Sequence, residues 1–440
     1  MVIRRDSEIL TQVGVGTMMG NLMRRYWIPA VKSSELVADG DPIRLMLLGE
    51  KLIAFRDSSG KVGVMDHRCP HRCASLFFGR NEEGGIRCVY HGWKYDVDGN
   101  CLDMPNVPEK QNFKHKVHSK AYQTRESNGL IWVFMGDQQN VPALPGIEPA
   151  LLEEGEVRII FAQRECNWLQ ALEGDIDTSH FSWLHAGSIE LDQVPADNPG
   201  KYQLINRAPD LHVADTKWGT MYGAYRDTGE PDKLYWRIAQ FLFPFWTMPP
   251  DGDLTEHIIA RAWVPMDDKH TMFVHISWKG NAQGLRIDKD GKPLPGIKLG
   301  LDYAPRDTSW YGRWRLNSNN TNDYKIDRKA QRNSSFTGIN GIHLQDQAVT
   351  ESMGPITDHN FEHLAPSDLM ITQTRKALLK AAKEMDKGGK QPPGLNSENG
   401  FLRARAGDFV SDRASKWQDA YAEQLRRCVD PTGLLNSASN

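Results

Sequence analysis

The chain has 440 residues, of which 40% are hydrophobic, and a formal net charge of -3, so it can bury a sizeable core in two or three domains. Its positive and negative side chains are interspersed without a basic stripe, which excludes nucleic acid as an expected partner. Because no apolar run reaches the roughly 18 to 20 residues of a membrane span and the amino-terminal segment lacks a secretory signal, we expect a cytoplasmic protein without a membrane partner.

Residues 1–150 are expected to form a short helix followed by a small antiparallel β domain. Met18, Leu22 and Tyr26 recur at helical spacing, which predicts a short amphipathic helix. Extended runs bounded by Gly, Asp or Asn follow, and these predict strands near 43–49, 51–57, 61–66, 85–90, 93–99 and 130–136. The segment 137–156 is rich in Pro and acidic residues, so we place a domain boundary near residue 150.

Residues 151–440 predict a second domain of mixed helix and sheet, which makes the fold class α+β. Helical periodicity covers 167–185, and longer strands are expected at 234–246, 256–265 and 271–278. The polar segment near 281–335 is too long for a plain connection, and such segments tend to be lids or mobile insertions. A surface helix is expected over 367–385, with Ser367 as its cap and Gly388 and Gly389 at its end.

Four residues of the first domain have the spacing of a metal site. Cys69 and His71 are separated by one residue, Cys88 and His91 by two, and sixteen residues lie between the pairs. Zinc fingers usually pair Cys with Cys and His with His, whereas here each pair mixes the two. In a Rieske [2Fe-2S] cluster one iron is bound by two thiolates and the other by two imidazoles. We therefore predict such a cluster, and a mixed-ligand zinc site is the alternative.

The other cysteines of this region support a metal site over disulfide bonds, because four of the six in the chain lie between residues 69 and 101. Cys73 and Cys101 fall outside the spacing pattern, and we expect them to be small buried residues beside the cluster. Pro70 stiffens the first loop, and Gly92 lets the backbone approach the cluster closely.

A second constellation lies in the expected helix at 167–185. On a regular α-helix Glu173, Asp177 and His180 share one face, and a carboxylate one turn before a histidine can orient its imidazole. His180 and His185 are five residues apart, which places them about 140° apart around a regular helix. Either the helix ends between them or it widens into a π-bulge, in which residues i and i+5 stack.

Two histidines need a third ligand to form an open iron site. Asp346 lies early in another expected helix and would complete a two-histidine, one-carboxylate triad, the geometry used for Fe(II) and oxygen chemistry. The spacing leaves His343, Glu351 and Asp358 open as alternatives.

The two constellations together resemble the catalytic (alpha) subunit of the Rieske non-haem iron aromatic ring-hydroxylating oxygenases. The resemblance covers nearly the whole chain and rests on C-x-H-x16-C-x2-H and E-x3-D-x2-H-x4-H. The segments GVGTMMGNLMRRYWIPA and CNWLQALEGDIDTSHFSWLH are similar to the phthalate dioxygenase branch. One departure is Cys73, where many relatives carry Gly.

The resemblance implies a Rieske domain followed by a helix-grip domain with mononuclear Fe(II), held by Asp346 together with His180 and His185. It also implies a homotrimer or stacked trimers, in which Asp177 meets the partner subunit's His91. The implied electron donor is a flavin and iron-sulfur reductase that uses NADH.

The expected function is that of a terminal oxygenase that uses O2 and NADH-derived electrons to hydroxylate an aromatic carboxylate, such as phthalate or a related benzoate, to a cis-dihydrodiol. Monooxygenation or aryl ether O-demethylation by the same sites is an alternative. A Rieske electron-transfer or redox-sensing protein without turnover is another. Arg207 and Arg237 are candidates to bind the carboxylate, because a planar guanidinium matches it, and Ser179 is a candidate to line the pocket.

Overall fold

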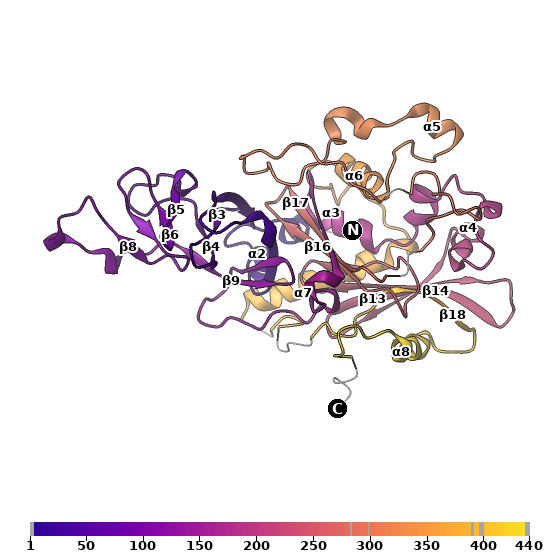
Figure 1. Ribbon diagram of the computed structural model, residues 1–440. Helices are drawn as coiled ribbons and strands as arrows, with labels where there is room; N and C mark the ends of the chain where they lie inside the picture. Colours follow the sequence, from indigo (N-terminus) through magenta and orange to yellow (C-terminus); the bar gives the residue numbers. More distant parts are fainter. Residues whose placement is uncertain (1–3, 282–283, 298, 389–390, 396–399, 436–440) are drawn as a thin grey trace.

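The computed structural model describes residues 4–281, 284–297, 299–388, 391–395 and 400–435. Their strands form a six-stranded, a four-stranded and an eight-stranded sheet. Figure 1 shows an elongated molecule, with the two smaller sheets at one end and the eight-stranded sheet with its helices at the other. The domain boundary near residue 150 stays a prediction. None of the described helices has the length and apolar character required to cross a bilayer.

The six-stranded sheet is antiparallel and contains the strands that were expected at 43–49, 51–57, 61–66 and 130–136. In spatial order its strands are β1 (Trp27–Lys32), β10 (Leu130–Phe134), β9 (Ala121–Ser127), β4 (Val62–Asp66), β3 (Glu50–Arg56) and β2 (Ile43–Leu47). Leu48 and Gly49 join β2 to β3 with φ of 46° and 76°, as a tight two-residue hairpin turn requires. The expected amino-terminal helix is α2 (Met18–Met23), and Thr17 caps it by accepting a hydrogen bond from the Gly20 amide.

The four-stranded sheet carries the two loops of the Cys and His pattern. Its strands are β5 (Arg80–Glu82), β6 (Gly85–Arg87), β7 (Lys94–Tyr95) and β8 (Cys101–Asp103). The strands expected at 85–90 and 93–99 are therefore much shorter than predicted. The backbone between β6 and β7 forms a loop with its own hydrogen bonds and does not continue the strand pairing. Within this loop Gly92 N–H donates to Cys88 O at 2.9 Å.

The eight-stranded sheet is the framework of the second half of the chain, and its mixture with helices confirms the α+β fold class. Its main path is β11 (Val157–Arg164), β17 (Thr271–Trp278), β16 (Ile259–Pro265), β15 (Trp246–Met248), β14 (Lys233–Leu242), β13 (Gly219–Asp227) and β12 (Asp210–Asp215), and β18 (Gly407–Asp412) pairs with β14. The strands expected at 256–265 and 271–278 are thus confirmed as β16 and β17, whereas the strand expected at 234–246 ends at Leu242 as β14, and Trp246 begins β15. All residues of β16 are buried, which explains why its sequence is almost continuously apolar.

Eight α-helices lie in the described ranges. They are α1 (Arg4–Thr11), α2, α3 (Trp168–Ile176), α4 (Tyr202–Ile205), α5 (Arg328–Asn333), α6 (Ile342–Ser352), α7 (Leu369–Asp386) and α8 (Trp417–Arg427). The long α7 packs against α2 and β13, while α3 packs against β15, β16 and α6. The helix α3 thereby lies between the sheet and α6, which brings their side chains together.

Two details of the second half of the chain concern the polar segment and the last expected helix. In the polar segment 281–335, Leu285 and Leu294 are buried with Ile342 in a small satellite core, and the expectation of a lid or mobile insertion stays a prediction. Ser367 does not cap α7, because a 3-10 turn, Pro366–Asp368, precedes the helix. Gly388 follows the helix with φ of +73°, and Gly389 lies outside the described residues.

A buried ion pair ties Glu148, in the segment before β11, to the carboxyl-terminal part of the chain. Glu148 accepts hydrogen bonds of 2.6 and 2.5 Å from Nε and Nη2 of Arg405, and the two side chains are only 1% and 2% exposed. Such a pair is costly to break on one side only, because the remaining charge stays buried.

We expect Arg405→Met to lower the free energy of unfolding by about 3–5 kcal/mol. Urea unfolding followed by far-ultraviolet circular dichroism measures this loss. The double variant Glu148→Leu, Arg405→Met should recover most of it, since neither charge remains. Equal stability of Arg405→Met and the unchanged protein would contradict the role of the pair.

Candidate functional site

The two Cys and His loops have matching backbone geometry. Cys73 N–H donates to Cys69 O, and Gly92 N–H donates to Cys88 O, each at 2.9 Å. Cys73 and Gly92 both have positive φ, at 62° and 81°. A Cβ on Gly92 would lie 2.5 Å from Pro105 Cγ, so only glycine allows the second loop to close here. Each loop thus presents one cysteine and one histidine in the same manner.

The four predicted ligands differ in solvent exposure, with the cysteines buried and the histidines partly exposed. Cys69 and Cys88 are 1% and 3% exposed, inside a small apolar core. His71 and His91 are partly exposed, and their ring centroids lie 4.4 Å apart. Thiols on the inside and imidazoles at the surface fit a cluster with one buried iron and one outer iron.

The donor set also fits a cluster better than one zinc ion. Two thiolates on a tetrahedral zinc lie only about 3.8 Å apart. In the described ranges, His180, His185 and Asp346 form the one group of three or more residues whose possible ligand atoms all lie within 4.8 Å of one another. The donor atoms of Cys69, His71, Cys88 and His91 do not form such a group. They are therefore farther apart than binding to one zinc ion requires. His91 Nδ1 is buried and has no hydrogen-bond partner among the described residues, as expected of an atom that a metal would complete.

The expectation for Cys73 is wrong, whereas that for Cys101 is confirmed. Cys101 is buried in the apolar core beside the loops, but Cys73 is exposed. The reason is the left-handed backbone at Cys73, which turns the side chain outward. Glycine adopts this conformation without strain, which explains why Gly suits this position in the family that the chain resembles.

The helix expected over 167–185 ends early and gives way to a π turn. The α-helix α3 ends at Ile176, and Asp177 is already extended, with φ of -87° and ψ of 114°. A π-helical turn then covers Phe181–His185, and Ala186 N–H donates to Phe181 O at 2.9 Å. Of the two alternatives for His180 and His185, the π geometry is the one observed, although it forms a separate turn after the end of α3 rather than a bulge within it.

The early end of α3 separates residues that were expected to share one face. Glu173 stays on α3 and accepts hydrogen bonds of 2.5 and 2.7 Å from Nε and Nη2 of Arg375. Its pKa is raised by burial, against the opposing effect of Arg375. Glu173 is therefore a structural partner of α7, and Asp177 alone accompanies His180.

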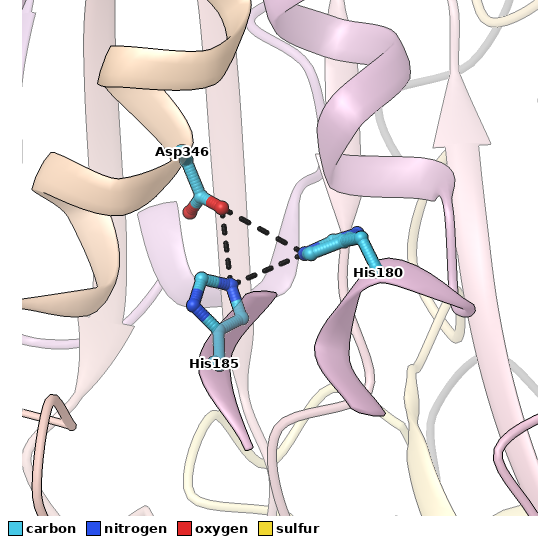
Figure 2. Close-up of side chains that lie close together, drawn as sticks. All are labelled: His180, His185 and Asp346. Atoms are coloured by element: carbon cyan, nitrogen blue, oxygen red, sulfur yellow. Dashed lines mark hydrogen bonds and ion pairs between the residues drawn. The ribbon is translucent and has the colours of Figure 1, made fainter. Parts of the chain in front are cut away.

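Three side chains from two elements converge on one point. Figure 2 shows His185, at the end of the π turn, and His180, directly before the turn, facing Asp346 on α6. His180 Nε2 lies 3.2 Å from His185 Nε2, and Asp346 Oδ1 lies 3.0 Å from His185 Nε2 and 3.7 Å from His180 Nε2. Two imidazoles and one carboxylate on a single side leave the opposite side open, as in an iron triad for oxygen chemistry.

The alternative third ligands lie elsewhere. Glu351 accepts a 2.8 Å hydrogen bond from the Glu165 amide and another from the Tyr324 hydroxyl. Asp358 is exposed on the surface, and His343 lines a different cavity.

Gln345, which the sequence did not single out, orients His185. Its Oε1 accepts a 2.6 Å hydrogen bond from His185 Nδ1. Its Nε2 donates to Gly296 O at 3.1 Å and to Ile339 O at 2.8 Å, so the amide is held with its oxygen toward the imidazole. A proton on Nδ1 leaves Nε2 free to bind a metal. The only feature of the sequence that could have pointed to this role of Gln345 is its position directly before Asp346.

The charges around the triad favour an ionised carboxylate and a well-oriented His180. Burial would raise the pKa of Asp346, but the charge and hydrogen bond of His185 outweigh it and lower that pKa far below its ordinary value. Burial would lower the pKa of His180, but the nearby Asp177 carboxylate raises it instead. Asp177 Oδ2 lies 3.6 Å from His180 Nδ1.

Three cavities lie at or near the triad among the described residues. The triad lines a small cavity of about 50 Å³, and His180 and Asp346 also line a surface pocket of about 290 Å³. A larger cavity of about 430 Å³ has no triad residue in its lining, but it shares Asp251, Arg261 and Arg286 with the small cavity, and these three residues form the wall between the two. The larger cavity is an ordinary size for a small aromatic ligand.

The three predicted substrate contacts differ in their surroundings. Arg207 lines neither cavity and donates to Ser182 O at 2.7 Å, within the π turn. Arg237 lines the small cavity, where Thr178 Oγ1 and Pro250 O accept its hydrogen bonds at 3.0 and 2.8 Å. Ser179 lines neither cavity, and its buried hydroxyl has no hydrogen-bond partner in the part of the chain that the structure describes.

The comparisons with known proteins agree with this geometry. Residues 26–119 match the family model of the Rieske [2Fe-2S] domain, and residues 133–424 match that of the LigXa C-terminal domain like family. The 3-chlorobenzoate-3,4-dioxygenase oxygenase subunit of Comamonas testosteroni is 49% identical over 98% of this chain and 100% of its own length. The phthalate 4,5-dioxygenase oxygenase subunit of Pseudomonas putida is 38% identical over 87% of this chain and 86% of its own.

The chain belongs to the Rieske non-haem iron aromatic ring-hydroxylating oxygenases. Its fold is shared with the solved structure of the NdmA QL mutant of Pseudomonas putida CBB5 with caffeine, at 17% identity and a TM-score of 0.54 over 91% of this chain and 100% of that one. The oxygenase is an oxidoreductase with a Rieske [2Fe-2S] cluster and a mononuclear iron as its cofactors. Membership of this family sets aside the expectation of an electron-transfer protein without turnover.

We expect Gln345→Leu to weaken iron binding by the oxygenase about 10–100-fold, because His185 loses the acceptor that orients it. Iron retained after dialysis against a chelator measures this, and the visible spectrum of the Rieske cluster should not change. Gln347→Leu, on the same helix but bonded to Glu351, is the matched control. Equal iron retention in both variants would rule out the role of Gln345.

Proposed function

We propose that this oxygenase hydroxylates an aromatic carboxylate, such as phthalate or a related benzoate, to a cis-dihydrodiol. The electrons come from NADH through a flavin and iron-sulfur reductase. The observation that carries the substrate class is the larger cavity, which adjoins the triad cavity and has the cationic side chains of Arg261 and Arg286 in the shared wall. The two relatives named above, which act on chlorobenzoate and phthalate, support the same class.

In this proposal Cys69 and Cys88 hold one iron of the cluster, and His71 and His91 hold the other. His180, His185 and Asp346 hold the mononuclear Fe(II). When bound, the two centres supply electrons and the activation of O2 at the open side of the triad. The chain's own part is to hold the imidazoles and carboxylate in place and to enclose the arene next to them.

We also propose that the active assembly is a homotrimer or a stack of trimers. Figure 1 supports this, because the four-stranded sheet with the Cys and His loops lies at the end of the molecule remote from α3 and α6. Asp177 and His180 are 23% and 26% exposed on their side chains, and Val349 and Met353, beside them in a surface pocket, are 38% and 50% exposed. A second copy could cover this surface, so that Asp177 bridges His180 to the partner subunit's His91.

Isotope labelling tests the proposed reaction. The oxygenase, with an NADH-dependent reductase and ¹⁸O2, is offered phthalate isomers, chlorobenzoates and methoxybenzoates. We expect two labelled oxygen atoms in a dihydrodiol for each NADH consumed. One labelled atom per product would establish monooxygenation instead, and methanal from a methoxybenzoate would establish O-demethylation.

His180→Ala tests the triad in the same assay. This variant should keep the visible and paramagnetic resonance spectra of the reduced cluster but lose oxygen incorporation completely, since two ligands do not hold the iron. Retained turnover would refute the assignment of the triad.

Asp177→Asn tests the bridge between the centres. We expect it to retain both metal centres and to lower turnover about 10–100-fold, because the amide cannot orient His180 as the carboxylate does. Single-turnover oxidation of the reduced cluster measures the step directly. An unchanged rate would show that electrons do not pass through this side chain.

A further inference from the structure

The wall between the two cavities contains a pair of arginines that the sequence did not identify. Arg261 lies on β16, Arg286 follows β17, and both line the triad cavity as well as the larger one. A group bound at this wall from the larger cavity is therefore held next to the triad. Arg207 lines neither cavity.

Both guanidinium groups are held by a carboxylate and retain donors without a partner. Arg261 Nη1 donates to Asp175, and its Nε is buried with no acceptor among the described residues. Arg286 Nη2 donates to Asp251, and its Nε and Nη1 are likewise buried without an acceptor in the described ranges. Each side chain is 10% exposed. Buried donors without an acceptor are rare in native proteins, so this wall is suited to a ligand that supplies acceptors.

The lining of the larger cavity favours an anionic ligand. It includes three arginines and one lysine but only one acidic residue, Asp251. Burial and then the charge of Arg261 lower the pKa of His343 to about 3 and that of His275 well below its ordinary value. Both imidazoles are thus neutral at physiological pH, and they do not compete with the arginines for the anion.

We propose that Arg261 and Arg286 form the clamp that binds the carboxylate of the substrate, with Asp175 and Asp251 holding the two guanidinium groups in place. This assignment rests on the proposed function and deepens it. A carboxylate accepts hydrogen bonds on both oxygens, which matches two fixed guanidinium groups. With its carboxylate fixed at the shared wall, the substrate would have its ring held in one orientation relative to the triad cavity. The distance from the carboxylate then selects which ring position is hydroxylated.

The sheet provides a matched control for the clamp. His275 on β17 pairs with Arg261 on one side and with Ile160 on the other. Arg158 is two residues before Ile160 on β11, so it lies on the same face of the sheet, but it does not line the triad cavity. Arg158 is exposed and makes no ion pair within the described part of the chain. It is therefore a cation of the same cavity that lies outside the clamp.

The test compares binding of 3-chlorobenzoate and phthalate with binding of their neutral carboxamides to the iron-loaded oxygenase, by isothermal titration calorimetry. We expect the unchanged protein to prefer each carboxylate over its carboxamide by at least about 30-fold. Arg286→Gln and Arg261→Gln should each reduce this preference at least about 10-fold, chiefly through weaker carboxylate binding. Arg158→Gln should change it less than about 3-fold, since exposed charges contribute little.

Folding is checked for each variant by its thermal midpoint and by the visible spectrum of the cluster. If Arg286→Gln does not fold, Arg286→Lys retains the charge without the planar fork, and an intermediate loss of preference is expected. The clamp is overturned if the unchanged protein shows no preference for a carboxylate, if both Gln variants keep it, or if Arg158→Gln loses it instead. If the unchanged protein incorporates labelled oxygen into an aromatic carboxylate but both Gln variants keep the preference for carboxylate over carboxamide, the clamp alone is overturned. Absence of such turnover would overturn the proposed function.

Discussion

The five-residue step between His180 and His185 is the constraint on which the oxygen-reacting centre depends. An α-helix would point these imidazoles in different directions, whereas the π turn at Phe181–His185 brings their Nε2 atoms to 3.2 Å. A π turn is an uncommon conformation and needs support from its surroundings. Arg207 provides part of that support by donating to Ser182 O. A residue first considered as a substrate contact thus has an observed role in shaping the site.

The two proposed metal sites differ in how the chain treats charge and solvent. Around the Rieske loops the thiols are buried and the imidazoles reach the surface, which suits a centre that exchanges electrons with other proteins. Around the triad, His185 is 5% exposed and is fixed by Gln345. Burial there strengthens every hydrogen bond and charge interaction, because the local dielectric constant is low. The same chain therefore combines an accessible centre with an enclosed one.

The enclosed site also shows why its acids and bases are paired as they are. Asp175 and Asp251 sit against Arg261 and Arg286, and Asp346 faces two histidines. Each of these carboxylates thereby has a positive or metal-binding partner, and the surplus of positive charge lies on the side of the larger cavity. An aromatic acid that enters this cavity meets groups already held in position, which reduces the entropy lost on binding.

The sequence by itself determined the chemistry that depends on short spacings. The mixed Cys and His pairs, the histidines five residues apart and the alternating strands all follow from residues close together in the chain, and local backbone geometry is sufficient to read them. Which distant residues complete a site was decided by tertiary structure alone. Spacing left Asp346 one of four candidates, and nothing in the sequence linked Arg261 and Arg286, because their meeting depends on how β16, the insertion after β17 and α6 pack around α3. That packing is set by burial of apolar faces, which constrains where an element lies but leaves no local mark on the polar residues it brings together.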